Sequence, residues 1–154
     1  MIHSLYRIMN FCRRTVLRLL RTPSLGVKAL VVNDHNEVLL VEHTYIDGWH
    51  LPGGGLAYAE SPKMAVIREL REETGVVAIG EPILFKIYTH KVHGASDYPI
   101  LYIIRQFEVH PQKPSSEIKR AQWFALDKLP PETTESTRFR LKEYFENHLP
   151  SEHW

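Results

Sequence analysis

Three glutamates in the middle of the chain, Glu69, Glu72 and Glu73, have the spacing of one helix face. Residues three and four positions apart lie side by side on an α-helix, so these carboxylates gather within about one turn. Like charges at this distance repel and raise one another's pKa. Either the side chains spread into water and pair weakly with Arg68 and Arg71, or a divalent cation neutralises them. Carboxylates suit Mg²⁺ and Mn²⁺, which also bind the phosphates of a substrate.

The flanking residues predict the helix that carries these carboxylates. Pro62 suits the first helical turn, where no backbone donor is lost, and Gly75 suits the position just past the helix end. Residues 61–74 are therefore predicted to be helical. The run of glycines at 53–55 precedes this helix, and glycine lets the backbone turn sharply and approach a phosphate closely.

Seven fixed residues and two aliphatic residues around this helix form one spaced pattern: Gly54, Glu60, Arg68, Glu69, Leu70, Glu72, Glu73, Gly75 and Val76. A random chain of this length contains such a pattern with a probability on the order of 10⁻⁷. The 23-residue segment resembles the Nudix box at every defining position. The resemblance implies an α/β/α sandwich with a mixed β-sheet, in which the box forms a loop, a helix and a loop.

The resemblance also implies roles for individual residues. The metal ligands would be the three box carboxylates and the main-chain carbonyl of Gly53, and the metal would be Mg²⁺ with Mn²⁺ as a substitute. Glu60 and Arg68 would form an internal ion pair that holds the loop and the helix in register. Arg68, with Gly54 and Gly55, is also expected to contribute to substrate binding.

The general base is open among several side chains. Glu72 and Glu73 are candidates within the box. Glu117 is the candidate outside it, because residues 115–118 resemble the acidic loop before the last strand of the family, although a solvated loop acid has the same appearance. Histidine is a residue type that suits proton transfer near neutral pH, so His90 and His93 are further candidates, and they also fit the surface of a loop.

Aromatic residues are candidates for stacking on a base. Tyr45 and Trp49 precede the box, and Tyr98 and Tyr102 lie in a later strand. Aromatic side chains in strands also pack in cores, so each position has a structural alternative.

The resemblance implies hydrolysis of a pyrophosphate bond in a nucleoside diphosphate linked to another moiety. Sequence markers of the coenzyme A, NADH, ADP-ribose and dinucleoside-polyphosphate subfamilies are absent around the box. A nucleoside triphosphate or a nucleotide sugar is therefore favoured. The alternative is a non-catalytic domain of the same fold that binds a nucleotide or a protein. Members of that kind typically lose box carboxylates, whereas this chain retains them.

The remaining elements follow from hydrophobic patterning. Residues 27–32 and 38–41 are β-branched runs around the turn-forming residues 33–37, which predicts a β-hairpin. Further strands are expected at 76–79, 83–92, 98–109 and 119–125, and a helix within 131–148. Strands before and after one central helix, closed by a second helix, indicate an α/β or α+β sandwich.

The N-terminal segment has a different character from the rest. Residues 1–22 hold five arginines and no acidic residue, while apolar side chains recur at helical spacing. We expect a basic amphipathic helix over residues 3–21, in a segment 1–24 that precedes a domain over 25–154. Its apolar face fits packing on the domain or on a second copy in a homodimer. Contact with a membrane surface and an organelle-targeting presequence are the alternatives.

Composition limits the remaining classes. The 154 residues suit one domain, and 44% hydrophobic with 24% charged residues is ordinary for a globular protein. Beyond residue 22 the net charge is −4, which argues against broad nucleic-acid binding. A single cysteine, Cys12, excludes an internal disulfide, and we expect a reducing compartment, the cytoplasm.

Overall fold

The computed structural model describes residues 23–92, 94–112 and 115–154. The helix predicted for residues 3–21, and with it the homodimer contact through residues 1–22, lies outside these ranges. In the described ranges no helix is long and apolar enough to cross a membrane.

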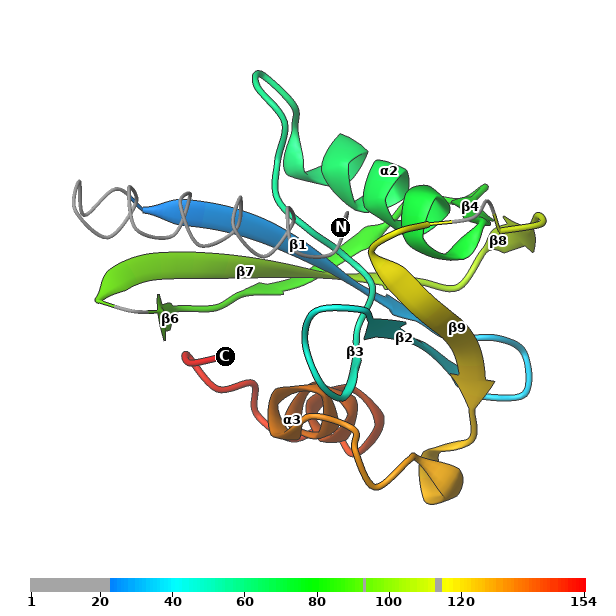
Figure 1. The fold of residues 1–154 in the computed structure, drawn as a ribbon. Coiled ribbons are helices and arrows are strands. Elements are labelled where there is room, and N and C mark those ends of the chain that lie inside the picture. Colours follow the sequence, from blue (N-terminus) through cyan, green and yellow to red (C-terminus); the bar gives the residue numbers. More distant parts are fainter. Residues whose placement is uncertain (1–22, 93, 113–114) are drawn as a thin grey trace.

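The described chain alternates short strands with two α-helices (Figure 1). In chain order the elements are β1 (Ser24–Val31), β2 (Val38–His43), β3 (Trp49–His50), α2 (Pro62–Thr74), β4 (Val76–Ala78), β5 (Ile83–Ile87), β6 (His90–Val92), β7 (Ala95–Ile104), β8 (Phe107–Val109), β9 (Ile118–Phe124), the 3₁₀ helix η1 (Leu126–Lys128) and α3 (Glu135–Phe145). Figure 1 shows α2 on one side of the β1–β7 pair and α3 on the other.

The strands form three sheets. In the first, β1 pairs in parallel with β7, and β5 and β6 both pair antiparallel to β7. In the second, β2 lies between β3 and β9 with antiparallel pairing, and the third is the antiparallel pair β4–β8. The mixed parallel and antiparallel pairing between two helical layers confirms the predicted sandwich.

The predicted hairpin between residues 27–32 and 38–41 is wrong. Both segments are strands, but β1 belongs to the first sheet and β2 to the second. Only an isolated bridge between Val32 and Val38 joins them. The turn itself forms as expected, because the side-chain oxygen of Asn33 accepts from the backbone N–H of His35 and of Glu37. The strands separate after this turn because β1 finds its partner in β7.

Two long predicted strands are each divided. Residues 83–92 form β5 and β6 with a break at residues 88–89, and residues 98–109 form β7 and β8 with a break at residues 105–106. At the second break the Gln106 carbonyl accepts from the backbone N–H groups of Ile79 and Gly80. The helix predicted within 131–148 is α3, which begins after Thr134, whose side chain accepts from the backbone N–H of Thr137.

Strand β1 is covered on both faces, which explains its nearly continuous apolar sequence. Val27, Ala29 and Val31 belong to the core cluster beneath α2. Leu30 on the opposite face belongs to the cluster that α3 covers, together with Leu141 of α3. The strand therefore occupies the centre of the molecule and provides a rigid base for the segment that follows β3.

Helix α2 begins and ends where its flanking residues predict. The hydroxyl of Ser61 accepts from the backbone N–H of Met64 at 3.2 Å, which satisfies one free donor of the first turn. Gly75 has a φ of 76° and its N–H donates to the Arg71 carbonyl, so it ends the helix in a left-handed conformation. Val66 and Leu70 are fully buried on the face toward the sheet. Burying this face fixes the direction in which the helix presents its charged residues.

Candidate active site

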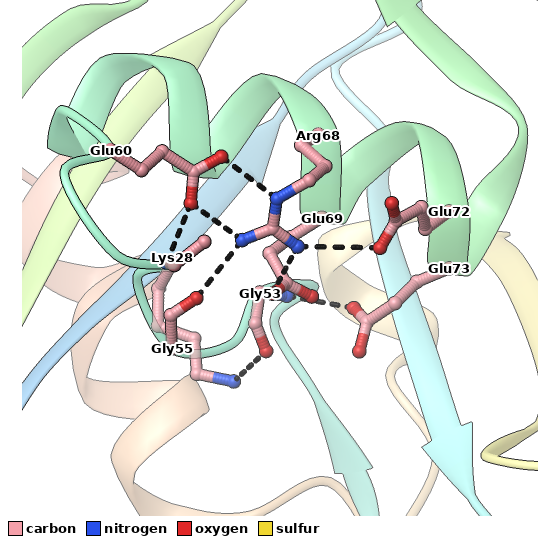
Figure 2. Close-up of polar contacts among 9 residues, drawn as sticks. Lys28, Gly53, Gly55, Glu60, Arg68, Glu69, Glu72 and Glu73 are labelled. Carbon is pink, nitrogen blue, oxygen red and sulfur yellow. Dashed lines mark hydrogen bonds and ion pairs between the residues drawn. The ribbon is translucent and has the colours of Figure 1, made fainter.

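Arg68 joins the loop before α2 to the helix itself (Figure 2). Its Nε and Nη2 both donate to the Glu60 carboxylate at 2.8 Å. Nη2 also donates to the Gly55 carbonyl, and Nη1 donates to Glu69 at 2.7 Å and to Glu72 at 3.3 Å. All five donors of the guanidinium group thus have acceptors in the protein. The predicted internal ion pair with Glu60 is present. Acceptors among the described residues occupy the donors of Arg68 in this arrangement, and its direct contact with a substrate stays a prediction.

Glu73 is the most deeply buried carboxylate of the box, with an exposed fraction of 8%. Its Oε2 accepts a 2.7 Å hydrogen bond from the backbone N–H of Gly53. Burial raises the pKa of Glu73 to about 7, against the opposing effect of the Lys28 charge and of this hydrogen bond. Burial also raises the pKa of Glu69, while Arg68 opposes the rise. Both carboxylates would therefore gain from a positive charge placed beside them.

The side chains do not form a closed metal site as they stand. Among the described residues, no three His, Cys, Asp or Glu side chains are arranged to hold a metal ion. The reason is that Glu69 and Glu72 turn toward Arg68, while Glu73 turns toward Gly53. Figure 2 shows the three carboxylates on the same part of α2, beside the Gly53 loop. Hard oxygen donors of this kind fit Mg²⁺ or Mn²⁺, provided that Glu69 and Glu72 rotate away from Arg68.

Two glycines of the loop lie in close contact with their neighbours. Gly53 has a φ of 139°, and a Cβ at this position would lie 2.0 Å from the Val27 carbonyl oxygen. At Gly54 a Cβ would lie 2.6 Å from the carboxyl carbon of Glu69. The absence of side chains thus lets the loop lie directly on β1 and on the acidic face of α2.

Lys28 is a site residue that the sequence analysis missed. It projects from β1, is partly exposed, and its Nζ donates to the carbonyls of Leu51 at 3.1 Å and Gly53 at 3.2 Å. Burial lowers the pKa of its ammonium group, and the charges of Glu73 and Glu69 oppose this effect. One signal was available, because Lys28 is the single charged residue in the apolar run of β1.

Two histidines near Lys28 were also missed. His43 has an exposed fraction of 9%, and its pKa is lowered to about 3 by burial and by the charge of Lys28. Burial lowers the pKa of His50 as well, although its hydrogen bond with the Asp47 carbonyl opposes the shift. The ring centroid of Tyr45 lies 5.2 Å from that of His43. Contact of Tyr45 with a substrate stays a prediction. Both imidazoles are neutral at physiological pH.

Two of the aromatic residues considered for stacking are core residues. Trp49 has an exposed fraction of 5% and packs edge-on against Phe124 at 4.8 Å between ring centroids. Tyr102 has an exposed fraction of 7% and belongs to the cluster beneath α2. Both side chains are largely buried in the core, and stacking on a base stays a prediction for them. Tyr98 is partly exposed.

Of the acid–base candidates outside the box, Glu117 lies near the carboxylates. It is partly buried, and its charge adds to the effect of burial in raising the pKa values of Glu69 and Glu73. His90 is exposed, and its Nδ1 lies 3.9 Å from Asp97 Oδ2. His93 lies outside the described residues.

The NUDIX domain model matches residues 22–145, which is most of the chain. The chain belongs to the Nudix family. It is 34% identical over 101 residues to an RNA pyrophosphohydrolase of Ruthia magnifica subsp. Calyptogena magnifica, covering 66% of this chain and 52% of that protein. It is also 34% identical over 107 residues to Nudix hydrolase 8 of Arabidopsis thaliana, covering 66% of this chain and 29% of that protein.

The Nudix fold is equally clear among solved structures. A MutT NUDIX hydrolase from Burkholderia pseudomallei superposes with a TM-score of 0.70 and 29% identity, covering 80% of this chain and 98% of that one. The chain spans about half or less of the length of the two curated relatives, and the names of those relatives describe their whole chains. The Nudix box of this chain is the loop, α2 and Gly75 described above.

Proposed function

We propose that the protein is a metal-dependent Nudix hydrolase that cleaves a pyrophosphate bond in a nucleoside diphosphate linked to another moiety. The observation that carries this proposal is the acidic face of α2, where Glu69, Glu72 and Glu73 lie beside the Gly53 loop (Figure 2). The ion pair between Arg68 and Glu60, called the brace below, holds that loop against the helix. The ligand set consists of the three carboxylates with the Gly53 carbonyl.

The chemistry is the attack of water on phosphorus. When bound, Mg²⁺ or Mn²⁺ would neutralise the phosphate oxygens and lower the pKa of a bound water. The water oxygen bonds to phosphorus, the bridging P–O bond breaks, and its electrons leave with the departing phosphate. A carboxylate of the chain accepts the proton of the water. The products are a nucleoside monophosphate and the phosphorylated remainder.

Three carboxylates are candidates for the proton acceptor. Glu73 has a pKa raised to about 7, which suits a base at neutral pH, and only its Oε2 is used by Gly53. Glu72 is more exposed, and among the described residues its ion-pair partner is Arg68. Glu117 approaches from the loop before β9 and leaves the box carboxylates free to hold the cation. We assign the base to Glu117, with Glu73 as the alternative.

The proposed substrate is a nucleoside triphosphate or a nucleotide sugar, since markers of several other subfamilies are absent. The name of the Ruthia magnifica relative, an RNA pyrophosphohydrolase, adds RNA to the substrates that merit testing. The proposed setting is the cytoplasm, which a single cysteine suits. A homodimer through residues 1–22 is part of the proposal, and light scattering of the full chain tests it.

Turnover by the purified chain tests the activity. The panel comprises nucleoside triphosphates, nucleotide sugars, dinucleoside polyphosphates and 5′-triphosphate RNA, each with Mg²⁺ and with Mn²⁺. Glu72→Gln and Glu73→Gln keep the shape of the side chains and remove charge, so each is expected to reduce kcat at least a hundredfold. Asp34→Asn, in an exposed turn, is the matched control. Near-normal turnover of Glu72→Gln and Glu73→Gln with Mg²⁺ would contradict the proposed mechanism.

One observation supports a second candidate, a Nudix-fold module that binds a nucleotide without cleaving it. Arg68 already pairs with Glu69 and Glu72, so the acidic face is partly neutralised without a metal. Such a module would bind members of the same panel and release them unchanged. Calorimetry alongside the turnover assay separates the two candidates.

A further inference from the structure

The backbone N–H and the carbonyl of Gly53 each form a hydrogen bond with a charged side chain, and the two side chains come from different elements. Its N–H donates to the Glu73 carboxylate of α2 at 2.7 Å, and its carbonyl accepts from the Lys28 ammonium group of β1 at 3.2 Å (Figure 2). This carbonyl is the one expected to ligate the metal. Lys28 therefore places a positive charge at the edge of the proposed metal site.

The ammonium group has capacity for a further partner. Lysine has three donors, and in the described part of the chain two of them reach the Leu51 and Gly53 carbonyls. Lys28 as a whole residue is partly exposed, and its third donor is the one that we assign to a ligand. Its neighbours His43 and His50 are kept neutral by burial, which leaves Lys28 as the charge on this side of the loop.

A purely structural role does not require a charge at this position. A neutral donor suffices for two backbone carbonyls, whereas a partly buried ammonium group is costly to desolvate. The compensating charges are the Glu73, Glu69 and Asp97 carboxylates, of which the first two are the proposed metal ligands. When a cation takes over these carboxylates, Lys28 needs another anion. A phosphate that arrives with the cation supplies one.

We propose that Lys28 binds a phosphate oxygen of the substrate through its third donor while it positions the Gly53 carbonyl. This inference rests on the proposed function, because it places the phosphates between Lys28 and the acidic face of α2. It defines the ligand as an anion of the phosphate class. Lys28 also couples the binding of the cation to that of the phosphate. Its charge repels a cation that binds alone, whereas a phosphate that binds with the cation offsets this repulsion.

Two binding measurements distinguish this role from a structural one. The variants are Lys28→Met, which keeps the length and removes the charge, and Lys28→Arg, which keeps the charge. Lys128→Met is the matched control, because Lys128 is an exposed lysine of η1. Calorimetry measures the affinity for AMP, GMP, CMP and UMP with saturating Mg²⁺, and for the corresponding nucleosides. A second titration measures Mn²⁺ without any nucleotide.

The expected results have opposite signs for the two ligands. Lys28→Met weakens the binding of the preferred monophosphate about tenfold and leaves its nucleoside unchanged, whereas it tightens Mn²⁺ at least threefold. Lys28→Arg restores most of the phosphate affinity, and Lys128→Met changes neither value. A disordered Gly53 loop would instead weaken Mn²⁺ and would lower monophosphate and nucleoside affinity together.

Three outcomes overturn the inference. In the first, the unaltered protein binds no monophosphate more tightly than the corresponding nucleoside. In the second, Lys28→Met leaves the monophosphate affinity unchanged. In the third, Lys28→Met lowers the affinity for Mn²⁺. Failure of the proposed function has a different signature. A protein that retains the Lys28-dependent preference for phosphate but hydrolyses no member of the panel would keep this subsite and lose the activity.

Discussion

The carboxylate of Glu73 and the backbone N–H of Gly53 are joined by a buried hydrogen bond of 2.7 Å. This contact connects the most buried acid of α2 to the loop residue whose carbonyl is a proposed ligand. One oxygen of Glu73 thus fixes the loop, while the other remains for a cation. The same carboxylate therefore links folding of the loop to the charge state of the site.

The first prediction concerns the pH dependence of stability. The pKa of Glu73 is raised from 4.5 to about 7, chiefly by burial, so the folded metal-free protein holds the proton more tightly than the unfolded chain. The contribution of protonated Glu73 to the free energy of unfolding is fully present below pH about 4.5 and is lost as the pH rises through about 7. Between pH 4 and 8 the unaltered protein should lose roughly 3 kcal/mol relative to Glu73→Gln. Urea denaturation in a chelator measures this difference.

Metal supplies the control for that prediction. Saturating Mg²⁺ favours the ionised carboxylate, so it should restore the stability of the unaltered protein above pH 7. The Glu73→Gln variant should gain much less. If both proteins show the same pH dependence without metal, Glu73 does not carry the buried proton.

The second prediction compares the two glycines of the loop. At Gly53 an added Cβ would lie 2.0 Å from the Val27 carbonyl oxygen, and the φ of 139° is unfavourable for alanine. Gly53→Ala should lower the free energy of unfolding by about 3 kcal/mol or more. At Gly54 the contact is with the flexible end of Glu69, so Gly54→Ala should cost about 1 kcal/mol or less. Its main effect should be weaker Mg²⁺ binding, because Glu69 is displaced. Equal losses of stability would contradict this distinction.

The third prediction concerns the brace between the loop and α2. Hydrogen bonds from Arg68 lower the pKa of Glu60 to about 2. The pair of Arg68 with ionised Glu60 therefore stabilises the folded protein above pH 4.5, and this stabilisation is lost as the pH falls toward 2. Arg68→Lys keeps the charge but cannot span Glu60 and the Gly55 carbonyl together. We expect this variant to bind Mg²⁺ about tenfold more weakly, because residues that orient ligands have effects of this size. Calorimetry would refute the role if Mg²⁺ affinity were unchanged.

The helix of the Nudix box was predictable because its determinants are local. Ser61, Pro62 and Gly75 mark its ends in the sequence, and the structure places α2 at Pro62–Thr74. The i, i+3 and i+4 spacing of the acids then fixes which face carries them. The directions of the carboxylates were not predictable, since Arg68 forms ion pairs with two of them.

Features that depend on distant segments were missed. Strand β1 pairs with β7, about seventy residues later, so the local turn at residues 33–37 gave the wrong impression of a hairpin. Trp49 follows a loop and precedes the box, yet Phe124 of β9 covers it. The role of Lys28 depends on the return of the chain at residues 51–53, which local patterning does not contain.

The fourth prediction tests the general base. Glu117 lies near the box carboxylates, whereas Arg68 bonds to Glu60 and Gly55 and to two acids of α2. Replacing Glu117 should therefore leave the contacts of Arg68 intact. If it accepts the proton of the attacking water, Glu117→Gln should lower kcat by about 10²–10⁴ with little change in KM. Asp34→Asn again serves as the control. A kcat within threefold of the unaltered protein would assign the base to the box itself.

The fifth prediction concerns an ion pair on the buried face of α3. Arg140 and Glu143 have exposed fractions of 3% and 7%, and Arg140 Nε lies 2.9 Å from Glu143 Oε2. The geometry of this contact is that of an ion pair rather than a hydrogen bond, since Arg140 Nε has no hydrogen-bond partner in the described residues. Glu143 also accepts from the Tyr88 hydroxyl at 2.8 Å and from the Ser151 N–H at 2.7 Å. One carboxylate thus joins α3 to two other segments.

Removing only the negative partner should be more harmful than removing both. Glu143→Gln leaves the Arg140 charge buried without its carboxylate, which should lower the free energy of unfolding by about 3–5 kcal/mol. The double variant Arg140→Met, Glu143→Leu removes both charges and keeps similar volumes, so it should recover a large part of this loss. Thermal and urea denaturation measure both values. Because the pair lies on the α3 side of the molecule, away from the acidic face of α2, kcat should remain near normal in each variant that folds. A double variant less stable than the single one would show that the hydrogen bonds to Tyr88 and Ser151, rather than the paired charges, hold this region together.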